Sequence, residues 1–180
     1  MTVMKAIQER SSVRRIDSRD IPAESLQSIL TAVQYSQSWA NSQCWELVVI
    51  RSQAVKEAIQ ETIPPGNPSY QCVVTAPVVL AVCGCLQRAG YYGGPVTKFG
   101  DWFMFDLGIV TENICLTAHS LGLGAVVVGL FDHIRAGEVI SVPDNHELVA
   151  LIPIGYPAAD YTPAPKIRRE IKDFLHEDRF

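Results

Sequence analysis

The sequence predicts a mixed α/β or α+β sandwich, built as a single domain over residues 1–180. Apolar runs typical of strands alternate with segments of helical periodicity, and the connections between them differ widely in length. Apolar residues make up 48% of the chain and charged residues 19%, which excludes a disordered protein and is enough for one core. No internal repeat and no linker divides the chain.

In the first half of the chain, the helix that begins near Pro22 is the best defined element. Proline suits the first helical turn, and Leu26, Ile29 and Val33 recur at the spacing of one helix face. The other predicted elements of this half are a short helix over residues 3–9, a polar loop over 36–43, a strand over 45–50, a surface helix over 53–62 and a proline-rich loop from 64.

In the second half, a buried strand and a long helix dominate the pattern. Residues 76–85 are apolar almost without interruption, which predicts a strand covered on both faces. Residues 102–121 predict a helix that is apolar nearly all round, as in the centre of a domain or in a subunit interface. The remaining predictions are a loop over 89–100, a strand over 125–131, a short helix over 134–140, a strand over 148–154 and a charged helix from about 166.

Charge and cysteine usage narrow the classes of partner and compartment. A net charge of −4 argues against non-specific binding to nucleic acid or anionic membranes. The longest apolar run, residues 76–86, is far shorter than the roughly 20 residues of a membrane helix. The N-terminus has no apolar core of a secretory signal, and five cysteines do not form a pattern of disulfides or metal ligands, so we expect a cytoplasmic protein without a metal.

Two stretches could carry chemistry. Residues 10–15 hold three arginines and two serines beside a helix end, which are good donors to a phosphate, although a solvated basic turn has the same composition. Lys166, Arg168 and Arg169 form a second basic cluster that would complete one phosphate pocket if the fold joins both ends of the chain. In the loop over 36–45, the polar side chains suit the edge of a planar heterocycle, although an ordinary turn is the alternative; they are Ser38, Asn41 and Gln43.

Together these motifs resemble the nitroreductase family of FMN-dependent oxidoreductases. Arg10, Ser12 and Arg14 match its R-x-S-x-[RK] motif, and residues 38–45 match P-S-x-x-N-x-Q-P-W, except that Gln37 and Cys44 replace the prolines, which predicts a less rigid loop. Further matches, in register, are the A-P pair at 76–77, the L-G-L-G end of the long helix, Gly129, the strand that ends at Pro157 and the pair Lys166 and Arg168.

The resemblance implies an α+β fold with a mixed sheet sandwiched by helices, in an intertwined homodimer that binds FMN at the subunit interface. One subunit would supply the basic motif to a flavin, and Ser38 and Asn41 would reach the same flavin from the other. The cofactor-binding residues that the family pattern implies are Arg10, Ser11, Ser12, Arg14, Ser38, Asn41, Gln43, Gly129, Lys166 and Arg168.

The activity that the resemblance implies is transfer of electrons from NAD(P)H to a small oxidised acceptor, such as a nitroaromatic, a quinone or an enone, by a ping-pong mechanism. The cofactor carries the redox chemistry, so no catalytic side chain is expected. One alternative is a narrower enzyme of the same fold, such as a reductive dehalogenase or enone reductase, with a lid over residues 63–72 or 87–98. The other is a non-catalytic FMN-binding sensor or storage module.

Overall fold

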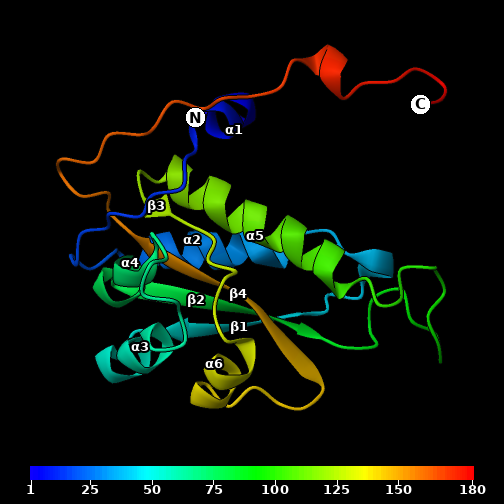
Figure 1. Ribbon diagram of the computed structural model, residues 1–180, viewed down its shortest axis with the longest axis horizontal. Helices are drawn as coiled ribbons and strands as arrows, with labels where there is room; N and C mark the ends of the chain where they lie inside the picture. Colours follow the sequence, from blue (N-terminus) through cyan, green and yellow to red (C-terminus); the bar gives the residue numbers. More distant parts are fainter.

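A four-stranded sheet forms the centre of the computed structural model, which describes residues 1–180 (Figure 1). The strands lie in the order β1-β2-β4-β3, and every neighbouring pair is antiparallel. Their bounds are β1 Trp45–Ile50, β2 Val78–Cys85, β3 Gly124–Ala125 and β4 His146–Gly155. The prediction of an α+β fold is thus confirmed, although the strands of this sheet run antiparallel rather than mixed. The parallel pairing lies in an isolated bridge between Ser12 and Ala125.

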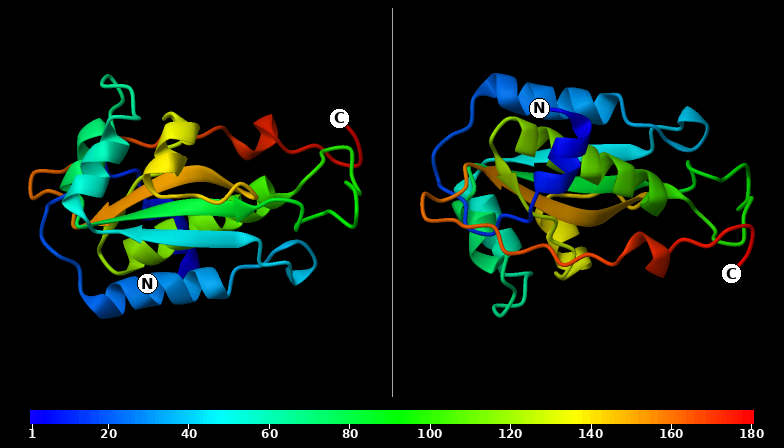
Figure 2. Two further views of the ribbon diagram at one scale, coloured as in Figure 1. Left: turned by 90° about the horizontal axis from the view of Figure 1, so that it is seen from below. Right: turned by 90° about the horizontal axis from the view of Figure 1, so that it is seen from above.

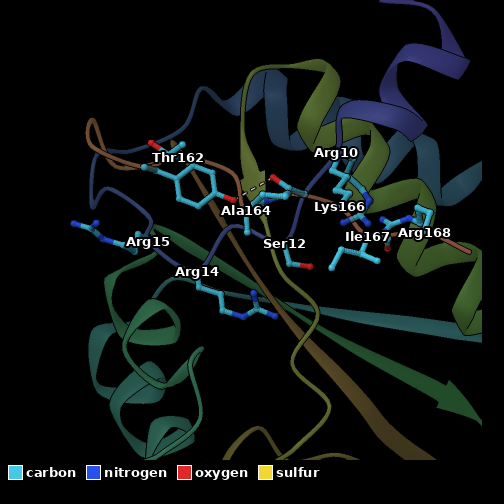
Figure 3. A pocket seen from close by; sticks show the side chains of 12 residues that line it. Arg10, Ser12, Arg14, Arg15, Thr162, Ala164, Lys166, Ile167 and Arg168 are labelled. Atoms are coloured by element: carbon cyan, nitrogen blue, oxygen red, sulfur yellow. Dashed lines mark hydrogen bonds between the residues drawn. The ribbon is translucent and has the colours of Figure 1, made fainter.

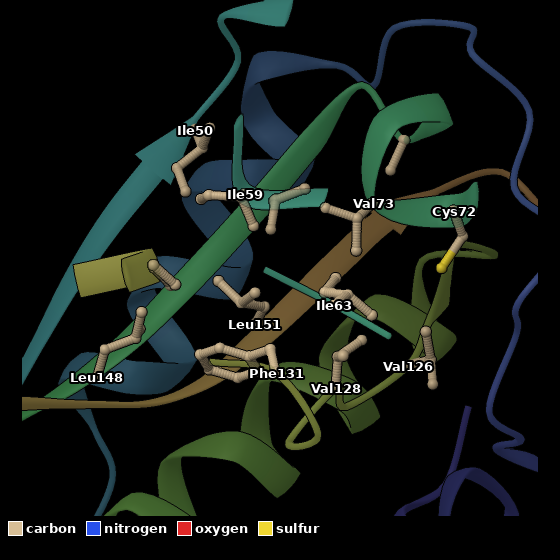
Figure 4. Close-up of a cluster of buried hydrophobic side chains, with 14 of the residues drawn as sticks. Ile50, Ile59, Ile63, Cys72, Val73, Val126, Val128, Phe131, Leu148 and Leu151 are labelled. Atoms are coloured by element: carbon tan, nitrogen blue, oxygen red, sulfur yellow. The ribbon is translucent and has the colours of Figure 1, made fainter. Parts of the chain in front are cut away.

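Helices cover both faces of the sheet (Figure 2). On one face, α2 (Ala23–Gln34) and α5 (Phe103–Ser120) pack together and bury side chains such as Ile29 and Ile114 against the sheet. The helices on the other face are α3 (Gln53–Gln60), α4 (Tyr70–Thr75) and α6 (His133–Val139). Figure 4 shows this second core, which includes Ile59 and Leu151. The double cover explains why β2 is buried from Val78 to Gly84 and reads as one continuous apolar run.

The segment that follows α1 (Val3–Glu9) crosses the edge of the sheet over a pair of glycines, Gly124 and Gly155. A Cβ atom on Gly124 would lie 2.7 Å from Val13, and one on Gly155 would lie 2.6 Å from Ile16. The Val13 N–H donates to the Ala125 carbonyl at 2.9 Å, so the backbones lie close together. The crossing places residues 10–15 beside the segment that leaves β4.

Two predicted elements are wrong. Of the strand predicted over 125–131, only Ala125 belongs to β3, and Val128 makes an isolated bridge to Leu151. Gly129 therefore lies outside any strand. The valines favour extended backbone, but that preference supplies no partner strand. The charged helix predicted from residue 166 is reduced to the 3-10 turn η2 (Ile171–Asp173). Ile167 and Ile171 are exposed, and a short helix without a packed face is marginal in water.

Sequence reasoning also missed α4. This helix has only six residues, and its last three are Val73, Val74 and Thr75, whose branched side chains favour strands over helices. The other predicted helices and strands are present within a few residues of their expected bounds. None of the helices has the length and apolar character needed to span a membrane.

Candidate functional site

Residues from opposite ends of the chain enclose a polar cavity of about 430 Å³ (Figure 3). The first wall is the segment after α1, and the second wall is the extended segment that follows β4. Six of the ten predicted cofactor-binding residues line this cavity: Arg10, Ser11, Ser12, Arg14, Lys166 and Arg168. The fold therefore joins the two basic clusters that lie about 150 residues apart in the sequence. Arg169, the other member of the second cluster, instead lies over the ring of Phe174.

Five cationic side chains line the cavity, and nearby carboxylates offset two of them. The Arg10 Nε lies 3.7 Å from a carboxylate oxygen of Glu112. The guanidinium of Arg15 donates to Asp160 at 2.6 Å. The three cations with no carboxylate within 4 Å are Arg14, Lys166 and Arg168. The cavity thus keeps a positive charge that a phosphate dianion would neutralise.

Hydroxyl groups complete the donor set of this cavity. The Ser11 Oγ lies 3.1 Å from the hydroxyl oxygen of Tyr161, and both residues line the cavity. Backbone pairing keeps the two walls together, because the Ala158 N–H donates to the Arg15 carbonyl at 2.9 Å. Sequence reasoning predicts the basic stretch that contains Arg15 but missed Tyr161 as a lining residue. Tyr161 lies in a proline-spaced segment that has no periodicity to show which way its side chain points.

Gly129 lines a second cavity, of about 710 Å³, whose walls are mostly apolar. A Cβ atom on Gly129 would meet nothing within 4 Å, so the glycine leaves this space open. The ring of His133 fixes the segment, with its Nδ1 2.8 Å from the Leu148 carbonyl and its Nε2 3.0 Å from the Gly129 carbonyl. The apolar walls include Phe103, Leu107, Val127, Leu148 and Ala150. Such walls suit a flat, largely apolar ring.

The other three predicted residues lie at the opposite end of the molecule. The segment that contains η1 (Trp39–Asn41) is at one end of the sheet, and the segment after α1 crosses the other end (Figures 1 and 2). Within the loop, the Gln43 N–H donates to the Ser38 Oγ at 3.0 Å, and the Gln43 amide donates to the Asn41 side chain at 3.3 Å. One subunit therefore does not bring Ser38, Asn41 and Gln43 to the cation cavity.

A buried carboxylate that the sequence analysis did not single out supports this loop. Asp106 lies in the first turn of α5 and is 1% exposed. Both of its oxygens accept from the Trp39 N–H, at 3.1 Å. One oxygen also lies 3.5 Å from the Cys44 thiol. Burial, with the nearby Asp106 charge second, raises the pKa of the Cys44 thiol to about 12, so the thiol keeps its proton and donates.

An aromatic cluster adjoins the same loop. The rings of Trp39 and Trp102 lie 5.1 Å apart between centroids, and those of Trp102 and Phe105 lie 5.2 Å apart. The Trp39 indole donates to the Tyr92 hydroxyl at 3.0 Å and so ties the loop over 87–101 to the loop over 38–43. The side chain of Phe105 is 62% exposed, which leaves a flat apolar surface at this end of the subunit.

These residues fit FMN. Its phosphate matches the guanidinium, ammonium and hydroxyl donors of the first cavity, and its ring system matches an open apolar cavity and a loop of amide and hydroxyl groups. The strongest part of this match is the chemistry of the donor set, in which three cations have no carboxylate partner. No cluster of side chains that could hold a metal ion is present.

Comparisons with known proteins agree with this fit. The sequence profile described as the nitroreductase family matches residues 7–156. The chain is 33% identical over 162 residues to a protein of Methanothermobacter thermautotrophicus with the provisional name NADH dehydrogenase/NAD(P)H nitroreductase; the match covers 88% of this chain and 78% of the other. It is 25% identical over 198 residues to an FMN reductase [NAD(P)H] of Bacillus subtilis, with 98% of this chain and 76% of the other covered.

A solved structure extends the likeness to the fold. The crystal structure of a nitroreductase family protein from Clostridium difficile 630 superimposes with a TM-score of 0.84 and covers 100% of both chains at 23% sequence identity. The shared fold includes the extended segment after β4, which lies beyond the range that the family profile matches.

Proposed function

The chain belongs to the nitroreductase family of oxidoreductases, and on that premise we propose that it is an FMN-dependent enzyme that passes electrons from NAD(P)H to a small oxidised acceptor. The acceptor class is a nitroaromatic, a quinone or an enone. The observation that carries the proposal is the polar cavity in which both ends of the chain gather five cations and four hydroxyl-bearing side chains. The relative named FMN reductase supports the choice of cofactor.

We assign the cation cavity to the phosphate. Arg10, Ser11, Ser12, Lys166 and Arg168 bind it through charge-assisted hydrogen bonds. We further propose that Gly129 leaves room for the ring system, and that Arg14, which lines the cation cavity, stabilises negative charge on the reduced ring. The bound FMN supplies the two-electron redox chemistry, and the protein supplies binding, orientation and exclusion of water.

The active form that we propose is a homodimer with two FMN molecules at the subunit interface. The amide and hydroxyl groups of Ser38, Asn41 and Gln43 lie at the far end of the subunit from the cation cavity, so they reach a cofactor only across an interface. The helix α5 presents Met104 and Phe105 to solvent, both more than half exposed in the single chain. A partner subunit would cover these apolar side chains.

We propose that NAD(P)H and the acceptor bind to the same site one after the other, in a ping-pong mechanism without a catalytic acid or base. The aromatic cluster of Trp39, Trp102 and Phe105 would form part of that site, since flat apolar surfaces stack on planar substrates. The five cysteines are free, and we propose the reducing cytoplasm as the compartment of this single-domain protein.

An absorption spectrum followed by an anaerobic titration tests the proposal. The purified protein, reconstituted with FMN, should show a flavin spectrum, and one equivalent of NADH or NADPH should bleach it rapidly. An acceptor such as a quinone should then restore the colour. Binding of FMN without bleaching would favour the sensor or storage module, and failure to bind FMN would contradict the proposal. Turnover limited to halogenated phenols or to enones would favour the narrower enzyme.

A further inference from the structure

Asp106 stands out because it is a buried carboxylate that faces no cation. No arginine, lysine or histidine nitrogen lies within 4 Å of it. A buried charge needs donors, and every side-chain or long-range donor to Asp106 comes from the loop over 38–44. Its place in the first turn of α5 also favours a negative charge, since the helix dipole is positive there.

The loop that Asp106 contacts has an unusual backbone. Ala40, Asn41 and Gln43 have φ values of 44°, 56° and 48°, a left-handed conformation that residues other than glycine rarely adopt. The Gln43 N–H donation to the Ser38 Oγ closes the turn. Such a conformation persists only where the surroundings hold it in place.

The chemistry at position 44 links the loop to Asp106. The sequence analysis predicts a less rigid loop because Gln37 and Cys44 replace prolines of the family motif. In the structure, the Cys44 thiol instead lies 3.5 Å from the Asp106 carboxylate. A proline at 44 would offer no such donor, and it would disfavour the left-handed backbone of Gln43 that precedes it.

We propose that Asp106 is a positioning residue that holds the 38–44 loop in its left-handed form before any cofactor arrives, and thereby sets the affinity for the flavin of the opposite subunit. The second half of this inference rests on the proposed function. The first half concerns the protein alone and is measured without FMN.

The experiment compares Asp106→Asn with the wild-type dimer. Asparagine keeps the shape but has one acceptor oxygen in place of two, and its NH2 group cannot accept from the Trp39 N–H. In the FMN-free protein, amide exchange at Trp39 should become at least about tenfold faster, and the FMN dissociation constant should rise at least about tenfold, as expected from the loss of a hydrogen bond to a charged group.

Three further variants separate positioning from general destabilisation. Cys44→Ser keeps a donor to Asp106 and should stay within about twofold of wild type in both measurements, whereas Cys44→Ala loses the donor and should lie between wild type and Asp106→Asn. Ile59→Val removes one methylene from the core on the other face of the sheet. It should lower the global stability and speed exchange of the core amides, while exchange at Trp39, which occurs through local opening of the loop, stays unchanged.

The outcomes are distinct. Unchanged Trp39 exchange in Asp106→Asn would overturn the inference, whatever happens to FMN. Faster exchange with unchanged FMN affinity would overturn the link to the cofactor and leave the loop with a structural role. If the wild-type protein does not bind FMN, the proposed function fails, and the exchange data still decide whether Asp106 holds the loop.

Discussion

Arg168→Ala should weaken the binding of FMN while leaving the binding of riboflavin almost unchanged. Arg168 lines the cation cavity and has no carboxylate partner, so its charge is available to the phosphate. Charge-assisted hydrogen bonds contribute roughly 1.5–3 kcal/mol, which corresponds to about a tenfold to 150-fold change in the dissociation constant. Riboflavin has the same ring but no phosphate, so its dissociation constant reports on everything except this contact.

The neighbouring arginine offers a matched control. Arg169 has the same charge and lies on the same exposed segment, but its guanidinium lies over the ring of Phe174 and it does not line the cavity. Arg169→Ala should therefore change the FMN dissociation constant by less than about threefold, as exposed surface charges do. Quenching of flavin fluorescence at constant ionic strength measures the dissociation constants of FMN and riboflavin for the wild type and both variants.

Two results would refute this reasoning. An equal loss of FMN affinity in Arg168→Ala and Arg169→Ala would mean that the general charge of the C-terminal segment, rather than a contact, attracts the ligand. A parallel loss of riboflavin affinity would mean that Arg168 acts on the ring or on the fold of the cavity.

Three other outcomes are expected. Arg14→Ala should lower the two-electron reduction potential of bound FMN by tens of millivolts, where 30 mV corresponds to about 1.4 kcal/mol, and redox titration against a reference dye would show no shift if Arg14 only holds the phosphate. Light scattering should give a mass about twice the 19.8 kDa of one chain, and a stable folded monomer would exclude the dimer. Burial lowers the pKa of His119, helped by the charges of Lys166 and Arg10 and opposed by Glu9. The free energy of unfolding should therefore fall as the pH drops below about 6.5, because the unfolded state then binds a proton more readily than the folded state. Chemical denaturation of His119→Gln at several pH values should show that this dependence is lost.

The parts of the fold that the sequence predicts correctly are those determined by local pattern. The helix α5 follows from a long segment that is apolar nearly all round, and β2 follows from an uninterrupted apolar run, because each needs only its own residues to be recognised. The run from Ala125 to Phe131 looks equally strand-like, yet most of it finds no neighbouring strand. Strand formation depends on a partner elsewhere in the chain, and composition does not report one.

The candidate site divides in the same way. Charge and hydroxyl content mark Arg10, Ser12 and Lys166 in the sequence, and the fold brings them to one cavity. The sequence does not single out Asp106, because it is one of two acidic residues in a long apolar helix and its partner Trp39 lies 67 positions away. The buried contact between them exists only in the folded chain.

The glycine pair under the N-terminal crossing has a consequence for how this protein tolerates mutation. Neither Gly124 nor Gly155 lines the cation cavity, yet a methyl group on either would push Val13 or Ile16 outward and carry Arg14 and Arg15 with them. A screen of random variants for bound yellow flavin should therefore recover neither Gly124→Ala nor Gly155→Ala. Among homologous sequences, we expect Gly124 and Gly155 to be as invariant as the arginines of the cation cavity, although neither glycine lines that cavity.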